Sequence, residues 1–222
     1  MNEKLIKKIL SVLPDEPGIM NSLEYPRSAV LAALYEKEGE PHLIFQKRNS
    51  AIRQGGEICF PGGRFDKEMD RNMLDTAVRE TMEEMGIERE NIEVLGQIDT
   101  LIASMGAVVH CFLGEMRIAD LSELDFSKGE VERVFSVPVQ WFKENPPAEY
   151  TVQVEIKPRY HDETGREVIL LPVEELGLPD RYREPWGHKN RRIYVYQVEG
   201  ETIWGITAQM VRHITALLSG II

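Results

Sequence analysis

Three glutamates, Glu80, Glu83 and Glu84, are the residues of this chain whose type and spacing could do chemistry. A helix would gather them on one side, since they are related by i+3 and i+4 spacing. Like charges at that spacing repel by roughly 0.2–0.5 kcal/mol per pair. A cation such as Mg²⁺ or Mn²⁺ reverses the repulsion, because hard cations prefer carboxylate oxygens. The pattern therefore predicts a metal site, while a solvated salt-bridge ladder through Asp75, Arg79 and Glu83 is the simpler interpretation.

The helix that would position these carboxylates is predicted to begin near Asp70 and to end at Gly86. Aspartate is a good N-cap residue, and glycine is the usual residue just past a helix end. At about 100° per residue, one side of this helix is apolar and should face the core, opposite the three glutamates. The residues of that side are Leu74, Val78, Thr81, Met82 and Met85.

The rest of the chain reads as a mixture of strands with a few helices. Apolar or alternating runs predict strands at 27–36, 42–48, 92–102, 105–115, 131–137, 150–156, 167–171 and 192–198. Helices are predicted at 3–12, after Pro138 and, as an amphipathic final helix, at 207–218, with a loop at 178–189. The order predicts an α/β protein without the regular alternation of a doubly wound sheet.

Composition limits the classes of partner and compartment. A net charge of −11 over 222 residues argues against nucleic acid or an anionic membrane as the main partner. Two cysteines, Cys59 and Cys111, suggest a reducing, cytoplasmic setting. No apolar run approaches the length of a membrane span, and Lys7 and Lys8 interrupt the apolar N-terminal residues, so we expect no signal peptide.

Two segments together carry a family resemblance: Phe60-Pro61-Gly62-Gly63, and the run from Arg79 to Ile87 that reads RETMEEMGI. In this order they resemble the Nudix box, the signature of the Nudix hydrolases. The first half departs from the family pattern, because the spacing from Gly63 to Arg79 is two residues longer and Arg71 stands where the family has Glu. We therefore expect an altered loop.

The resemblance implies an α/β/α sandwich with a mixed central sheet. On this basis residues 1–222 form a single Nudix hydrolase domain. Residues 1–24 would be an N-terminal helix and lead-in, and residues 145–190 an insertion within the domain.

A second resemblance lies upstream of the box. The residues Arg48, Ile52, Arg53, Gly56 and Phe60 to Gly63 are similar to the motif of coenzyme A pyrophosphatases, except that Gln54-Gly55 stand where that motif has His. This resemblance implies hydrolysis of the coenzyme A diphosphate to 4′-phosphopantetheine and adenosine 3′,5′-bisphosphate. The departures leave open another small-molecule nucleotide substrate, such as ADP-ribose or a nucleoside triphosphate, and also a non-catalytic ligand-binding module.

The resemblance also implies roles for particular residues. Glu80 and Glu84, with Glu83 beside them and the carbonyl of Gly63, would bind Mg²⁺ or Mn²⁺, and Arg79 would orient the glutamates through Asp75 and Glu83. Glu83 is the first candidate for the general base, with Glu130 or Glu132 as alternatives. The substrate would be contacted by Arg48, Arg53, Arg64, Gly62 and Gly63. A homodimer is possible.

Overall fold

The computed structural model describes residues 3–12, 25–103 and 106–221. Its centre is an eight-stranded mixed sheet with the strand order β3-β2-β1-β7-β5. Strands β4, β6 and β8 pair with β1, β7 and β2 respectively. Only β1 and β7 are parallel among the pairs of this sheet in the described residues. The strands are β1 (Arg27–Lys37), β2 (Glu40–Arg48), β3 (Ile58–Cys59), β4 (Gly62–Arg64), β5 (Ile92–Gln97), β6 (Leu101–Ile102), β7 (Val108–Met116) and β8 (Val131–Pro138).

Strand β1 lies in the middle of this sheet and contributes to a core on each face. Successive side chains of a strand point to opposite faces. Accordingly Leu31 and Ala33 belong to one buried cluster, while Ala32 between them belongs to the other. A nearly continuous apolar sequence is what a strand covered on both faces requires.

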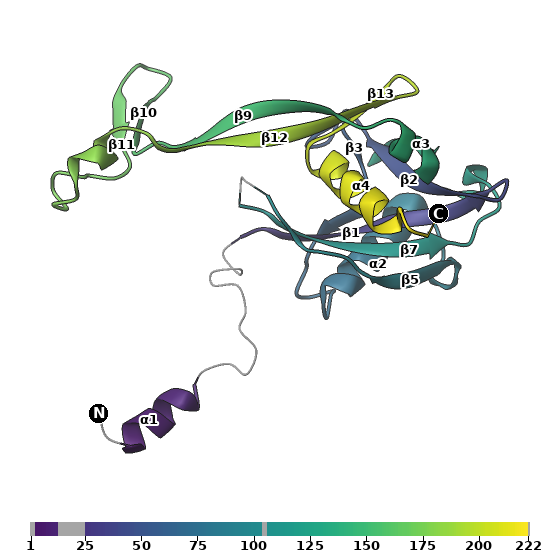
Figure 1. The fold of residues 1–222 in the computed structure, drawn as a ribbon, viewed down its shortest axis with the longest axis horizontal. Coiled ribbons are helices and arrows are strands. Elements are labelled where there is room, and N and C mark those ends of the chain that lie inside the picture. The colour runs from purple at the N-terminus through teal and green to yellow at the C-terminus, as the bar shows by residue number, and fades with distance from the viewer. Residues whose placement is uncertain (1–2, 13–24, 104–105, 222) are drawn as a thin grey trace.

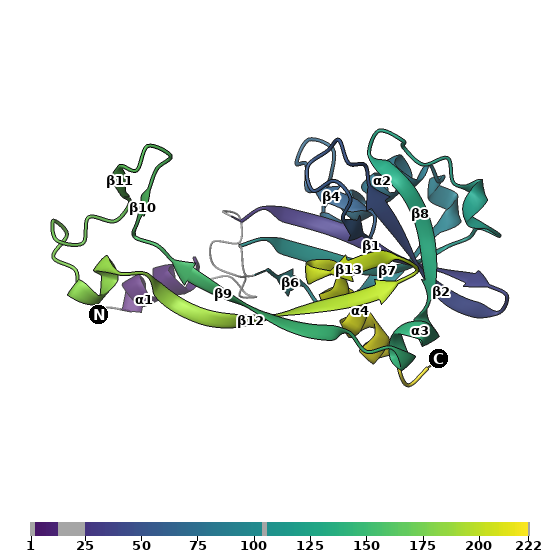
Figure 2. The same ribbon diagram turned by 90° about the horizontal axis from the view of Figure 1, so that it is seen from above.

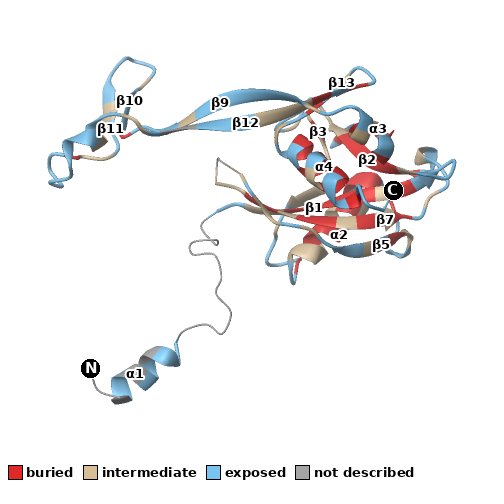
Figure 3. Cartoon of the chain, viewed as in Figure 1, coloured by how far each residue is buried: buried red, intermediate tan, exposed pale blue. Residues whose placement is uncertain are grey.

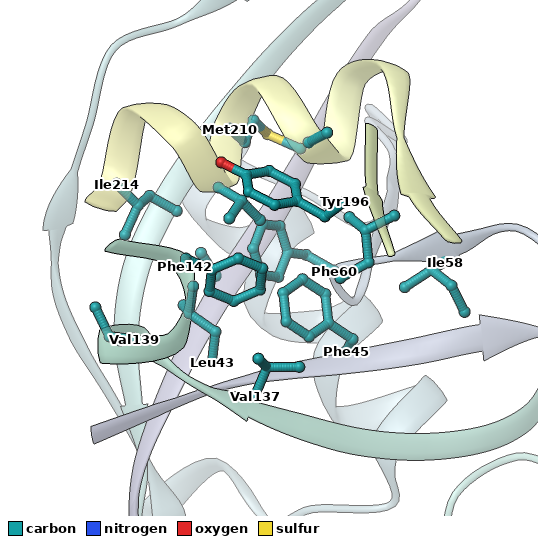
Figure 4. Packing of buried hydrophobic residues seen from close by; sticks show 14 of the residues in the cluster. Leu43, Phe45, Ile58, Phe60, Val137, Val139, Phe142, Tyr196, Met210 and Ile214 are labelled. Carbon is teal, nitrogen blue, oxygen red and sulfur yellow. The ribbon is translucent and has the colours of Figure 1, made fainter. Parts of the chain in front are cut away.

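Helices cover both faces, which confirms the predicted α/β/α sandwich (Figures 1 and 2). Helix α2 (Met73–Met85) packs on one face, and α3 (Val139–Glu144) and α4 (Gly205–Leu218) pack on the other. The core under α4 is rich in aromatic rings, with Phe45 stacked on Phe60 at 5.0 Å between centroids (Figure 4). Helix α4 is amphipathic, as predicted, and buries Val211 and Ile214 in this core. Single 3₁₀ turns stand at Arg89–Asn91 and Leu121–Glu123.

A long arm extends from the body (Figures 1 and 2). It is formed by β9 (Ala148–Ile156) and β12 (Trp186–Val198), which pair antiparallel, and β13 (Glu201–Trp204) joins β12 at the root. The tip carries a small hairpin of β10 (Arg159–His161) and β11 (Glu167–Ile169) and a 3₁₀ turn at Asp180–Arg183. Most of the arm is exposed (Figure 3).

The arm corrects two predictions from the sequence. The sequence Asp162 to Gly165 predicts a turn between the predicted strands 150–156 and 167–171, but these strands do not pair with each other: the first pairs with β12 and the second with β10. The predicted loop at 178–189 is wrong at its end, because β12 already begins at Trp186. Both errors have one cause: strands that are far apart in sequence but paired cannot be identified from alternation alone.

Helix α1 (Glu3–Leu10) forms where the N-terminal helix was predicted and stands apart from the body in Figure 1. The remainder of the predicted lead-in, residues 13–24, lies outside the described residues, and so do residues 104–105, where the predicted strand 105–115 begins. None of the helices in the described part of the chain is long and apolar enough to cross a membrane.

Candidate active site

The two glycines of Phe60-Pro61-Gly62-Gly63 allow close approaches that no other residue would permit. Gly62 has a φ of +153°, and a Cβ there would lie 2.3 Å from the carbonyl oxygen of Ala29 on β1. A Cβ on Gly63 would lie 2.2 Å from the carboxyl carbon of Glu80. The absence of a side chain at Gly63 therefore lets the Glu80 carboxylate of α2 rest directly against the backbone of β4.

The ends of α2 fix where its carboxylates lie. The helix begins after Asn72, whose side-chain oxygen accepts hydrogen bonds from the backbone N–H groups of Leu74 (2.9 Å) and Asp75 (3.0 Å). The prediction of Asp70 as the N-cap is therefore wrong. The predicted end is confirmed, since Gly86 is left-handed at φ +63° and its N–H donates to the carbonyl of Met82.

Asp70 lies in the altered loop before α2, and from there its side chain binds Arg79 on the helix. The Asp70 carboxylate accepts from Arg79 Nε (2.9 Å) and Nη2 (3.0 Å), and also from the Thr76 hydroxyl (2.8 Å). These hydrogen bonds, with that of Arg79 the largest, hold the pKa of this buried carboxyl well below its usual range. The other side of the guanidinium faces Glu80 (2.9 Å) and Glu83 (3.3 Å).

The predicted contact between Asp75 and Arg79 is wrong. Asp75 pairs with Arg71, whose Nε donates to its carboxylate at 2.7 Å. Arg71 stands four residues before Asp75, as Arg79 stands four after it, so helical spacing alone could not distinguish the two partners.

Glu84 is buried, although the helical projection grouped it with the exposed glutamates. Only 3% of it is accessible, and its Oε2 accepts from the backbone N–H of Gly62 (2.9 Å) and from Nε2 of Gln46 (2.7 Å). Arg48 Nη1 lies 3.8 Å from its Oε1. Burial raises the pKa of Glu84 to about 7. The projection failed because Glu84 lies on the same side as Ala77, which faces the sheet.

Gln46 was missed by the sequence analysis, although β2 carried a signal for it. Ile44 belongs to the core under α2, so strand alternation directs Gln46 and Arg48 to the same face. A polar residue in the middle of a buried strand needs a partner. The Gln46 amide nitrogen binds Glu84, whereas its oxygen is buried without a hydrogen bond in the described structure.

The donor set fits a hard divalent cation in its chemistry. The Glu80 carboxylate lies against the backbone of Gly63, where the missing side chain leaves room for it, and the Glu84 carboxylate is bound to the N–H of Gly62, so two carboxylates and a backbone carbonyl stand at this turn. Across residues 3–12, 25–103 and 106–221, however, no three His, Cys, Asp or Glu side chains converge closely enough to hold a metal ion. Glu80 and Glu83 are instead turned to Arg79.

The alternative bases lie on the segment that enters β8. Glu132 is paired with Lys47 at 3.4 Å. Glu130 is exposed, and its charge is one of the influences that raise the pKa of Glu80, although burial is the largest. Of these two residues, Glu130 is therefore the one coupled to the carboxylates of α2.

The three candidate substrate cations divide between two sides of the carboxylates. Arg48 contacts Glu84, and its Nε donates to the carbonyl of Arg53, whose side chain is exposed on the segment between β2 and β3. Arg64 lies beyond Glu80, in a pocket of about 520 Å³. That pocket also contains Arg27, Phe65 and Lys67, which the sequence analysis did not single out.

The chain is similar in sequence to known Nudix proteins. A family model described as the NUDIX domain matches residues 25–160. The uncharacterized Nudix hydrolase NudL of Yersinia pestis (strain Pestoides F) is 25% identical over 97% of this chain and 94% of its own length. NudL of Yersinia pseudotuberculosis serotype O:1b (strain IP 31758) is similar to the same extent, at 25% identity.

Solved structures similar to this chain include a hydrolase and a NUDIX domain. A C. elegans Ap4A hydrolase binary complex has a TM-score of 0.43 and 18% identity, over 52% of this chain and 83% of that one. The NUDIX domain of Shewanella oneidensis NrtR, complexed with ADP ribose, has a TM-score of 0.43 and 17% identity, over 66% and 89% of the respective chains. The family model matches more than half of the sequence, and on that ground the chain belongs to the Nudix hydrolase family.

Proposed function

We propose that this protein hydrolyses the diphosphate of coenzyme A or its acyl derivatives, giving 4′-phosphopantetheine and adenosine 3′,5′-bisphosphate. The observation that supports this most is that Nη1 of Arg48 lies 3.8 Å from Oε1 of Glu84. Arg48 opens the segment that resembles the coenzyme A motif, and Glu84 belongs to the Nudix box. The Phe60–Gly63 end of the same segment reaches Glu84 through the N–H of Gly62 at 2.9 Å.

Glu80, Glu83 and Glu84 are the proposed ligands of Mg²⁺ or Mn²⁺, together with the carbonyl of Gly63. When bound, the cation neutralises charge on the phosphoryl oxygens and acidifies a water molecule. The site is preorganised by the chain itself, because Glu84 is fixed by Gly62 and Gln46 while Asp70 fixes Arg79. Arg79 then limits the positions that Glu80 and Glu83 can take.

Glu83 is the proposed general base. Its side chain is 53% exposed, so a water molecule can reach the carboxylate, and Arg79 orients the carboxylate by contacting Oε2 at 3.3 Å. Glu130 is the second candidate because it is exposed and acts on Glu80. Arg48, Arg53 and Arg64 are proposed to bind the substrate phosphates through charge-assisted hydrogen bonds.

The proposal is tested by incubating the protein with Mg²⁺ and, in parallel, coenzyme A, ADP-ribose, NADH and nucleoside triphosphates. Products are identified by mass, and Glu84→Gln protein serves as the control for contaminating activity. We expect the highest kcat/KM for coenzyme A and only the two products named above. Preferred cleavage of ADP-ribose or of a triphosphate would contradict coenzyme A as the substrate. A protein that binds one of these ligands but cleaves none of them would contradict the assignment as an enzyme.

A further inference from the structure

The pocket beyond Glu80 lies between α2 and two other segments of the chain, β1 and the residues that follow the double glycine. One wall consists of Arg79 and Glu80, and the other of Arg27 from β1 and the segment Arg64 to Lys67 after the glycines. Its volume of about 520 Å³ is within the range of small-molecule sites. Because Glu80 is shared by the pocket and the carboxylate cluster, a ligand bound at the carboxylates has the pocket directly beside it.

The cationic side chains of this pocket differ in whether they are already paired with a carboxylate. Arg79 is already bound to Asp70, Glu80 and Glu83. By contrast, none of Arg27, Arg64 and Lys67 has a carboxylate partner within the described part of the chain, although Asp66 also lines the pocket.

The guanidinium of Arg27 is held over the Phe65 ring at 4.7 Å. In a chain with a net charge of −11, three such cations around one pocket form a site suited to an anionic group.

The other cationic segment near the site, from Lys47 to Arg53, is less available to bind an anion. Lys47 lies 3.4 Å from both Glu132 and Glu201, and Arg48 is directed at Glu84. Of the cations between Lys47 and Arg53, only Arg53 projects from the loop without such a pair in the described structure. The pocket therefore offers more uncommitted positive charge than the loop.

We propose that this pocket binds the phosphomonoester that the substrate carries in addition to its scissile diphosphate, which in coenzyme A is the 3′-phosphate. Arg64 and Lys67 donate to the phosphate oxygens, and Arg27, fixed over Phe65, supplies a third cation. This inference rests on the proposed function for the identity of the ligand. It differs in assigning substrate choice to the segment after the double glycine, rather than to the loop before it.

The kinetic test compares kcat/KM for coenzyme A and dephospho-coenzyme A in wild-type protein, Arg64→Gln, Lys67→Gln and Arg53→Ala. Arg64 and Lys67 are exposed, so these substitutions should leave the fold intact, which a melting curve checks. Losing one charge-assisted contact should reduce the preference for coenzyme A by about tenfold or more. The loss should come from a higher KM for coenzyme A. In Lys67→Gln the kinetics with dephospho-coenzyme A should be unaffected, and Arg64→Lys should restore part of the preference that Arg64→Gln loses.

A binding test separates this inference from the proposed function. Titration calorimetry with adenosine 3′,5′-bisphosphate and with AMP needs no turnover, and the bisphosphate should bind more tightly only when Arg64 and Lys67 are intact. If that holds while coenzyme A is not hydrolysed, the proposed function fails and the pocket stands. If coenzyme A is hydrolysed but its preference survives in the pocket variants, or is lost in Arg53→Ala instead, the pocket assignment is overturned.

Discussion

Arg79 connects the acidic loop before α2 with the carboxylates on the helix. Asp70 holds one edge of the guanidinium through two hydrogen bonds, and Glu80 and Glu83 share the other. A bidentate pair restricts rotation of the guanidinium plane more than a single contact does. Asp70 therefore acts as a positioning residue, although it does not itself touch Glu80.

Replacing Asp70 tests this role. Asp70→Asn should lower the free energy of unfolding by about 1.5–3 kcal/mol, the cost of a hydrogen bond to a charged group. Because the folded pKa of Asp70 is depressed, its contribution is complete well above an unfolded pKa of about 3.9. The contribution begins to decrease as the pH falls below that value and is lost as the pH falls through the lower folded pKa. Urea unfolding at pH 7 and at pH 3 measures both effects.

The same substitution should weaken metal binding. Without Asp70, the Arg79 guanidinium is free to bind Glu80 and Glu83 more completely and to compete with a cation for them. We expect a higher Kd for Mn²⁺, measured from free Mn²⁺ by electron paramagnetic resonance, with partial rescue in Asp70→Glu. An unchanged Mn²⁺ affinity in a folded Asp70→Asn protein would show that Asp70 is purely structural.

At the scale of elements, α2 is held against the sheet by a short apolar face. Val78 is 8% exposed and belongs to the core with Leu31 and Met85, while Leu74 and Met82 are half-buried at its edge. The side chains that fix the orientation of this helix are thus close to the glutamates on the same element. Packing and chemistry cannot be changed independently there.

Val78→Asp tests how the faces of α2 are assigned. An aspartate at this position would bury an unpaired charge, so we expect a loss of roughly 4 kcal/mol or more and little soluble protein. Val78→Ala is the matched control, which should lose only about 1–3 kcal/mol through the cavity that it leaves. A soluble Val78→Asp protein with a wild-type melting curve would contradict the burial of this face.

The arm is an element of a different kind, because none of the side chains described in its outer part belongs to either core cluster. Its root does contribute, through Tyr196 and Val198 of β12. Beyond the root, β9 is almost entirely exposed, and Val173 is a rare buried residue at the tip. This distribution supports the proposal that residues 145–190 contain an insertion within the domain.

Excising the outer arm tests that proposal. Val152 and Arg191 are register partners, so residues 153–190 can be replaced by an Asn-Gly turn that closes a two-residue hairpin. The shortened protein should fold and melt within a few degrees of the full chain, because both cores are retained. Failure of the shortened protein to fold would mean that the arm is part of the folding unit.

At the scale of the whole molecule, the site is joined to both cores. Phe60 is buried in the aromatic core under α4 (Figure 4). Two residues later, Gly62 touches β1 and its N–H donates to Glu84 on the opposite face. A ligand that ties Glu80 and Glu84 to this turn therefore bridges the two halves of the sandwich. Its binding should therefore increase the stability of the whole fold and not only of the site.

Millimolar Mg²⁺ or Mn²⁺ should accordingly raise the melting temperature. At ten times its Kd, a cation that binds only the folded state adds about 1.4 kcal/mol, or about 3–6 °C for a chain of this size. Glu84→Gln should reduce this shift and lower turnover by orders of magnitude. Full activity in excess EDTA would contradict the metal requirement.

Several features of this protein are determined by the sequence alone, because they depend on neighbours a few residues away. The end of α2 at Gly86 follows from glycine's access to positive φ, and burial of Val78 and Met85 follows from helical periodicity. Strands β1, β2, β5, β7 and β8 of the central sheet follow from their apolar runs, whereas the short strands β3 and β4 were not predicted and β6 is separate from β5 within the predicted strand 92–102. The Nudix resemblance of the box was likewise readable from residue types and spacing, and the family model confirmed it.

The tertiary structure decided which distant residues became partners. Gln46 and Glu84 are 38 positions apart, and they meet only because β2 and the double-glycine turn are packed beneath α2. Asp70 reaches Arg79 because the lengthened loop folds back onto α2. Strands β9 and β12 pair although the whole tip of the arm separates them in the sequence. Local propensity sets the type of an element, whereas strand register and packing select its partners, and these depend on the whole chain at once.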